Sequence, residues 1–190
     1  MSNVWVDPSS RRGFLFLGRL TEGKGVEVLV DAYRRAALNP DVWPLTIAGD
    51  GPLRTPLAKR LAEDGSRGIH LAGFVEGDDK DRALAGAKWL VAPSHCREAF
   101  GLVVIEARSV GVPCIVSTDG GLPEAAGRDA LLCEPAHVES LAGELCHAAN
   151  MTDSEYCERS KRARADLERD LLPPTFYADS YLQVLKERHR

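Results

Sequence analysis

The chain has 190 residues, of which 44% are hydrophobic and 27% are charged, and its formal net charge is −4. This composition predicts one globular domain with a buried core, and the slightly acidic balance argues against a nucleic-acid-binding module. Residues 1–12 lack the apolar core of a signal peptide, and no apolar run is long enough to span a membrane. We therefore expect a cytoplasmic protein that reaches a membrane surface only through a partner.

The first part of the chain predicts a tail, a strand and a helix. Residues 1–12 are polar and rich in turn-forming residues, so we expect a tail. Residues 14–17 form a short apolar run without alternation, which is typical of a strand buried on both faces of a parallel sheet. The segment R-L-T-E-G-K-G follows. The next helix, which ends at Asn39-Pro40, carries an apolar stripe at helical spacing that comprises Val26, Leu29, Val30, Tyr33 and Ala37.

Similar apolar runs recur along the chain and alternate with segments that favour helices. Five further strands are predicted at residues 45–48, 69–72, 89–92, 114–117 and 130–133. A helix is expected from Pro52, placed in its first turn, to about Asp64. Another should run to Ala87, with Asp78 and Asp79 as its caps.

The fourth strand leads into the loop P-S-H-C-R-E-A-F-G, and the next helix should open near Phe100 or Gly101. A further helix is expected from about His137 to Ala149. The sequence T-D-S-E is a capping box that starts a highly charged helix, which Pro173-Pro174 should stop. A last helix, over residues 175–187, carries an apolar stripe made of Tyr177, Tyr181, Val184 and Leu185.

This alternation predicts an α/β domain over residues 13–172, with a doubly wound parallel sheet of about six strands flanked by helices. In such sheets, ligands bind outside the carboxyl ends of the strands, where the strand order reverses. With the order 3-2-1-4-5-6, the loop that carries Arg19 and Lys24 would face the loop that carries Glu98. The sequence therefore predicts a ligand crevice between these two loops.

Two cations lie on the glycine-flanked loop G-R-L-T-E-G-K-G, directly before a helix. Arg19 and Lys24, together with a helix N-terminus, are suited to binding phosphate. The loop is not a G-x-x-x-x-G-K-S/T loop, and no G-x-G-x-x-G follows the first strand, which argues against a dinucleotide. Two solvated surface cations are the alternative, and the loop's place at the crevice favours phosphate.

Two carboxylates flank the start of the helix that follows the fourth strand. Glu106 lies inside that helix and could accept hydrogen bonds from two ribose hydroxyls, or it could be a solvated helix residue. Glu98 lies in the loop and could bind sugar hydroxyls. It could also act as a favourable charge near a helix N-terminus, worth about 0.3–1 kcal/mol.

The sequence does not predict a metal site. Asp79-Lys80-Asp81 resembles a D-x-D metal motif, but helix capping explains the two acids, and Lys80 opposes a cation. The histidines lack the H-E-x-x-H and H-x-x-E-H spacings. Five cysteines form no C-x-x-C pair, so neither a zinc site nor a disulfide framework is indicated; they are Cys96, Cys114, Cys133, Cys146 and Cys157.

Taken together, these motifs resemble the group 1 (family 4) glycosyltransferases, which are retaining enzymes of GT-B architecture. The resemblance spans roughly residues 13–133. It rests on G-R-L-T-E-G-K-G, on A-G-D-G-P-L and L-A-G-F-V, on A-P-S-H-C-R-E-A-F-G-L-V-V-I-E-A, and on G-V-P-C-I-V-S and G-G-L-P-E, in this order. The two glutamates that bracket F-G are the most specific of these signals. The resemblance implies a Rossmann-like domain that binds a UDP- or GDP-sugar and needs no metal or other cofactor.

The resemblance also implies roles for individual residues. Arg19 and Lys24 match the pair that holds the donor diphosphate, Glu106 matches the glutamate on the ribose, and Glu98 matches the one that contacts the transferred sugar. Arg19, Lys24 and Glu98 are thus the expected catalytic residues. Backbone groups that approach the sugar, the phosphates or the base are matched by Gly18, Gly73, Phe74, Val75, Phe100, Gly101 and Leu102.

A partner is implied as well. Family members have two Rossmann-like domains, and this chain corresponds to the second. We therefore expect an N-terminal acceptor-binding domain or chain to be required for transfer, with the helix in residues 173–190 packed against it. H-C-R before Glu98 is a variable part of the pattern that could bear on the choice of donor.

Two alternative functions stay open. The domain could be a non-catalytic interaction module that binds a partner through its last helix and carries a vestigial nucleotide site. The intact set of Arg19, Lys24, Glu98 and Glu106 argues against such decay. A nicotinamide-dependent enzyme on a similar sheet is disfavoured because the dinucleotide fingerprint is missing.

Overall fold

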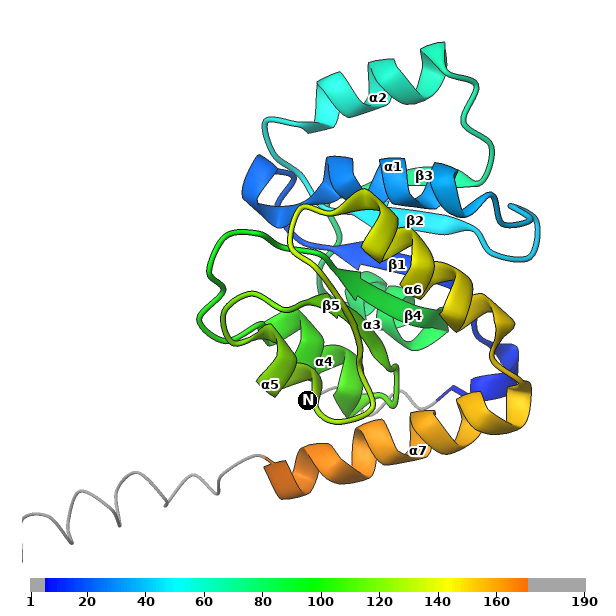
Figure 1. The fold of residues 1–190 in the computed structure, drawn as a ribbon, viewed down its shortest axis with the longest axis vertical. Helices are drawn as coiled ribbons and strands as arrows, with labels where there is room; N and C mark the ends of the chain where they lie inside the picture. Colours follow the sequence, from blue (N-terminus) through cyan, green and yellow to red (C-terminus); the bar gives the residue numbers. More distant parts are fainter. Residues whose placement is uncertain (1–5, 171–190) are drawn as a thin grey trace, which may run out of the picture.

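In the computed structural model, which describes residues 6–170, six parallel strands form one sheet in the order β3-β2-β1-β4-β5-β6 (Figure 1). The strands are β1 (Arg12–Leu17), β2 (Leu45–Ala48), β3 (Ile69–Gly73), β4 (Ala87–Ala92), β5 (Cys114–Ser117) and β6 (Leu131–Cys133). The strand order reverses between β1 and β4. The expected α/β fold, a Rossmann-like doubly wound sheet, is therefore confirmed, and the reversal lies where the sequence placed it.

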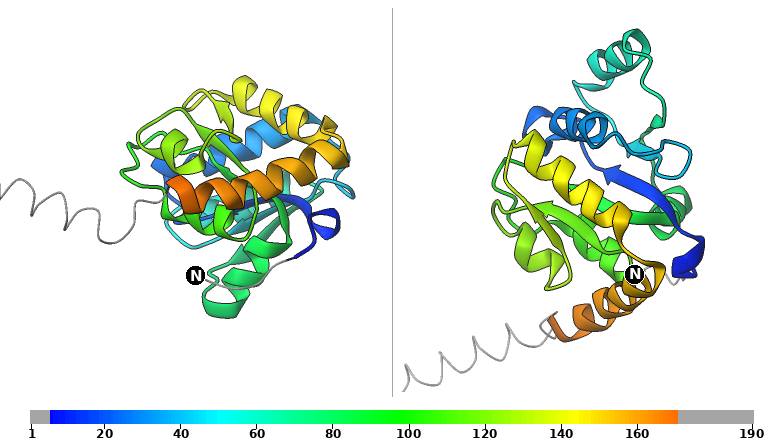
Figure 2. Two further views of the ribbon diagram at one scale, coloured as in Figure 1. Left: turned by 90° about the horizontal axis from the view of Figure 1, so that it is seen from below. Right: turned by 45° about the vertical axis from the view of Figure 1, so that its right-hand side comes forward.

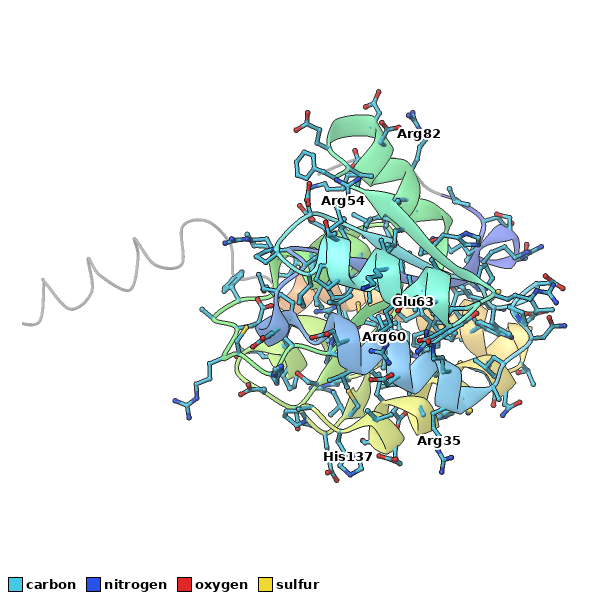
Figure 3. All side chains as sticks on the ribbon, turned by 90° about the horizontal axis from the view of Figure 1, so that it is seen from above. Arg35, Arg54, Arg60, Glu63, Arg82 and His137 are labelled. Carbon is cyan, nitrogen blue, oxygen red and sulfur yellow. The ribbon has the colours of Figure 1, made fainter. Side chains whose placement is uncertain are left out.

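Helices connect successive strands and cover both faces of the sheet. They are α1 (Val26–Ala36), α2 (Arg54–Glu63), α3 (Gly77–Gly86), α4 (Leu102–Ser109), α5 (Leu122–Ala126), α6 (Val138–Asn150) and α7 (Asp153–Asp170), with short 3₁₀ turns η1 (Pro8–Ser10) and η2 (Glu22–Lys24). In Figure 3, α3 lies on one side of the sheet, and α1 and α6 lie on the other. On α2, Arg60 forms an ion pair with Asp31 of α1, which joins these two helices.

Alternating side chains of β1 supply both halves of the core. Phe14 and Phe16 pack with residues of α1, α2 and α6, whereas Leu15 packs with residues of α3, α4 and α5. Phe14 also lies between Leu45 of β2 and Trp89 of β4 in the strand register. Because β1 is central and buried on both faces, its sequence is a continuous apolar run, and its last residues have a fixed position beneath the crevice.

Helix α7, orange in Figure 2, packs beside α4. The expected capping box starts this helix. The Thr152 amide donates to the Glu155 carboxylate at 3.0 Å, and the Glu155 amide donates to the Thr152 hydroxyl at 3.3 Å. Tyr156, which is buried, donates to the carbonyl of Lys88 at 2.8 Å and ties α7 to β4.

Several element boundaries differ from the expectations. α2 begins at Arg54 rather than Pro52, because Leu53 is its N-cap and its carbonyl accepts from the Leu57 amide at 2.9 Å. Asp78 and Asp79 lie in the first turn of α3 and do not cap it.

Three further differences concern single elements. Ala37 ends α1 in a left-handed conformation instead of continuing its stripe. Ala87 opens β4 instead of ending α3, since it pairs with Arg12. The five-residue helix α5 was not expected, because it is too short to show a helical periodicity.

The expected tail over residues 1–12 is also too long. Arg11 is fully buried and donates to the carbonyls of Val110, at 2.6 Å, and Gly111, while Arg12 opens β1. An arginine that satisfies carbonyls at a helix end belongs to the folded unit. Pro173-Pro174 and the last helix lie outside the described residues. No helix within residues 6–170 is long and apolar enough to cross a membrane.

Candidate functional site

The loops that follow β1 and β4 lie side by side at the carboxyl ends of the strands (Figure 1). The amides of His95 and Cys96 both donate to the carbonyl of Gly23, at 2.9 and 3.2 Å. A side chain on Gly23 would come within 2.9 Å of the Cys96 Cβ. The topology thus brings together the two loops that the sequence predicted to face each other.

Lys24 and Glu98 meet directly across this contact. The Lys24 Nζ forms an ion pair with the Glu98 Oε1, and both side chains are largely shielded from solvent. The Ser94 hydroxyl donates to the same Oε1 at 2.9 Å. These contacts fix the first of the two predicted carboxylates beside one of the two predicted cations.

A cleft of about 400 Å³ opens beside this ion pair. Its polar lining comes from Arg19, Lys24, Ser94 and Glu98. The rest of the wall includes the end of β1 and the start of α4, with Gly18, Phe100, Gly101, Leu102 and Val103. The polar lining of this cleft therefore consists of two cations, one serine and a single carboxylate.

A second cleft, of about 470 Å³, shares Gly18, Arg19, Leu102 and Val103 with the first. It is lined by Gly18, Arg19, Gly49, Asp50, Phe74, Val75, Lys80, Leu102, Val103 and Glu106. The Lys80 Nζ donates to the Glu106 Oε1 at 2.8 Å. Each cleft thus contains one of the predicted carboxylates, each carboxylate has a lysine partner, and Arg19 borders both clefts.

Among residues 6–170, the Arg19 side chain has no ion-pair or hydrogen-bond partner, and it is exposed to solvent. The start of α4 lies beside it, since Leu102 and Val103 also line both clefts. The first amides of a helix have no acceptor within the helix, and they carry partial positive charge. The junction of the two clefts is therefore suited to an anion held by a guanidinium and a helix N-terminus.

Exposed apolar side chains surround the two clefts. Phe74 is 68% exposed, Phe100 57% and Leu102 68%. Three residues, Gly73, Phe74 and Val75, were expected to lie near the base of the nucleotide. Phe74 and Val75 line the second cleft, whereas Gly73 ends β3. Apolar walls with a few convergent polar groups are typical of small-molecule sites.

Lys80 is the residue that the sequence pattern did not assign to the site. It was considered only as a charge that opposes a metal, yet it pairs with Glu106, which is 26 residues away along the chain. The contact arises because α3 packs against α4. Among residues 6–170, no cluster of three or more metal-ligating side chains occurs, and Asp79 of the D-x-D sequence pairs with Arg82.

The cysteines differ in accessibility, which gives a first prediction. Cys96 is exposed in the loop beside the ion pair, whereas burial raises the pKa of the Cys114 and Cys133 thiols to about 12. Since the thiolate is the nucleophile, we expect iodoacetamide at neutral pH to modify Cys96 in the folded protein and to reach the other two only after unfolding. Timed labelling with peptide mass spectrometry measures this order. Native-state labelling of Cys114 would contradict its packing.

Comparison with known proteins adds to this geometry. A family model described as "Glycosyl transferases group 1" matches residues 11–150. D-rhamnosyltransferase WbpZ of Pseudomonas aeruginosa is 37% identical over 117 residues, which are 61% of this chain and 29% of that protein. Glycogen synthase of Mycobacterium tuberculosis is 32% identical over 158 residues, which are 82% of this chain and 37% of that protein. The chain thus spans about a third of the length of these curated relatives.

A solved structure has a similar fold. Anabaena HepE in complex with UDP superposes with a TM-score of 0.77 at 20% identity, over 95% of this chain and 50% of that one. At this identity the similarity concerns the fold.

Proposed function

The chain belongs to the group 1 glycosyltransferases, and on this basis we propose that it forms the nucleotide-sugar-binding half of a retaining enzyme of hexosyltransferase type. One observation carries the proposal: Arg19 borders two clefts, and each cleft contains one carboxylate of the E-x(7)-E pattern. A nucleoside diphosphate sugar has the same order of groups. Its diphosphate lies between a sugar and a ribose, which both present hydroxyls.

The assignment of groups follows this order. Arg19, Lys24 and the N-terminus of α4 bind the diphosphate, with the backbone at Gly18 close by. Glu98 accepts hydrogen bonds from the transferred sugar, beside the backbone of Phe100, Gly101 and Leu102. Glu106 accepts hydrogen bonds from the ribose, and the segment Gly73, Phe74 and Val75 receives the base. In HepE, a protein of the same fold, UDP is the bound nucleotide.

The proposed chemistry needs positive charge at the leaving group. Arg19, Lys24 and the dipole of α4 stabilise the diphosphate as the bond to the sugar breaks. Glu98 orients the sugar and is not a nucleophile. The acceptor attacks from the face that the diphosphate leaves, and a phosphate oxygen helps to deprotonate it. The acceptor site is expected on an N-terminal domain or chain, so this chain alone binds the donor and does not transfer the sugar.

Ligand-dependent stability tests the donor site. A nucleoside diphosphate at 100 times its Kd stabilises the folded state by about 2.7 kcal/mol, which for a chain of this size raises Tm by roughly 5–10 °C. We expect such a shift with UDP or GDP in a thermal unfolding assay. Inorganic phosphate controls for anion binding, and NAD⁺ controls for a dinucleotide site. If no nucleoside diphosphate or diphosphate sugar shifts Tm at millimolar concentration, the donor site is refuted.

A further inference from the structure

Two buried serine hydroxyls form a chain of hydrogen bonds that leads from the sheet to Glu98. Ser117, the last residue of β5, is fully buried and donates to the carbonyl of Ser94. Ser94 is 3% exposed and donates through its own hydroxyl to the Glu98 Oε1 at 2.9 Å. Glu98 itself lies in a loop without regular structure. A loop carboxylate is therefore connected to a rigid strand through two short, neutral side chains.

Both donors that hold Glu98 use the same oxygen. Ser94 and Lys24 bind Oε1, and within residues 6–170 neither of them binds Oε2. A carboxylate oxygen can accept two hydrogen bonds, so Oε1 is fully occupied by the protein. Oε2 then remains to accept hydrogen bonds from a ligand, and the direction in which it points depends on the groups that hold Oε1.

The two groups that donate hydrogen bonds to Glu98, Ser94 and Lys24, are not equivalent when a nucleotide sugar binds. Lys24 is a flexible cation, and a diphosphate in the adjoining cleft competes with Glu98 for its ammonium group. Ser94 carries no charge and lies two residues after the end of β4, which pairs with β5 as far as Ala92 and Val116. We therefore expect its hydrogen bond to Glu98 to persist when a bound diphosphate changes the position of Lys24.

We propose that Ser94 is a positioning residue for donor recognition, which acts through Glu98 by holding Oε1 so that Oε2 meets the hydroxyls of the transferred sugar. This proposal rests on the proposed function, because it needs Glu98 to contact the sugar. It assigns to Ser94 a role in binding the sugar and no role in binding the nucleotide. Glu98 stays oriented even when Lys24 is shared with the diphosphate.

The test compares two ligands that share the nucleoside diphosphate, of which one also carries the sugar. Calorimetry on the full chain gives the Kd of UDP and of UDP-glucose, or of GDP and of GDP-mannose if GDP is the better ligand. The ratio of the two Kd values isolates the sugar contribution. We expect Ser94→Ala to reduce this contribution about three- to tenfold and to leave the Kd of the diphosphate within about twofold. Ser94→Thr, which keeps the hydroxyl, should restore the ratio.

A double-mutant cycle separates positioning from a structural role. Glu98→Gln should remove the sugar contribution, and adding Ser94→Ala to Glu98→Gln should then have no further effect. Ser160→Ala is the matched control: this serine is also fully buried and donates to the carbonyl of Gly111 at 2.6 Å, near the opposite end of the sheet. It should lower Tm without changing the ratio.

Each outcome of the cycle decides the proposal. The proposal is overturned if Ser94→Ala weakens the diphosphate as much as the diphosphate sugar, or if the two substitutions act additively. It is also overturned if Glu98→Gln leaves the ratio unchanged while the diphosphate still binds, a result that spares the nucleotide site. Failure of every diphosphate to bind would instead refute the proposed function itself.

Discussion

Replacing Arg19 with alanine is expected to weaken the binding of a nucleoside diphosphate roughly tenfold or more. Hydrogen bonds to a charged group contribute about 1.5–3 kcal/mol, and about 1.4 kcal/mol corresponds to a factor of ten in Kd. Arg19 borders both clefts, and its side chain is exposed. Its removal should therefore cost binding energy without a penalty in folding stability. Calorimetric titration with UDP or GDP measures the change.

Arg35→Ala is the control for the Arg19 substitution. Arg35, labelled in Figure 3, is also exposed; it lies in the last turn of α1 and lines neither cleft. Its loss changes the net charge by the same amount and should leave the Kd unaltered. Arg19→Lys keeps the charge but loses the forked guanidinium, so an intermediate Kd is expected. Equal affinities for Arg19→Ala and Arg35→Ala would show that the diphosphate binds elsewhere.

Gly25→Ala is expected to destabilise the fold strongly. Gly25 lies between η2 and α1 with a φ of 71°, and a Cβ there would lie 2.2 Å from the carbonyl oxygen of Pro93. A side chain would be strained by the left-handed backbone and would push the β1 loop away from the β4 loop. We expect a loss of about 2–5 kcal/mol in the free energy of unfolding, and a loss of nucleotide binding, because Lys24 is the preceding residue. Urea unfolding followed by circular dichroism gives the first quantity.

The matched control is a glycine without such a contact. Gly143 lies inside α6, and a Cβ there would meet nothing within 4 Å. Gly143→Ala should therefore stabilise the protein by about 0.5–1 kcal/mol through helix propensity. If Gly25→Ala unfolds at the same urea concentration as the wild type and binds nucleotide normally, the β1 and β4 loops do not pack as closely as described.

The sequence predicted the sheet because the determinants of the sheet are local. Each strand is a short apolar run, and the alternation with helices leaves few possible orders once right-handed crossovers are assumed. The proximity of Lys24 and Glu98 followed from that order alone, and the structure confirms it. Their roles as ligands remain proposals.

The features that the sequence did not predict depend on packing between distant elements. Lys80 meets Glu106 only because α3 and α4 are adjacent, and no spacing rule connects residues on two helices. Arg11 looked like part of a polar tail, because arginine is rarely buried. Its burial depends on carbonyls at the end of α4, about a hundred residues later. The role of Ser94 was similarly hidden, since a serine after proline is common in turns.

The loop that carries Glu98 is enclosed by main chain on both sides. On one side, Gly23 accepts from its amides; on the other, the Gly121 amide donates to the Glu98 carbonyl at 2.7 Å, and a Cβ on Gly120 would lie 2.5 Å from the same oxygen. Surface loops usually tolerate insertions and deletions, but here a change of length would break contacts with two other loops at once. Side-chain replacement leaves these main-chain contacts intact, and Cys96 and Arg97 are exposed positions at which it can occur.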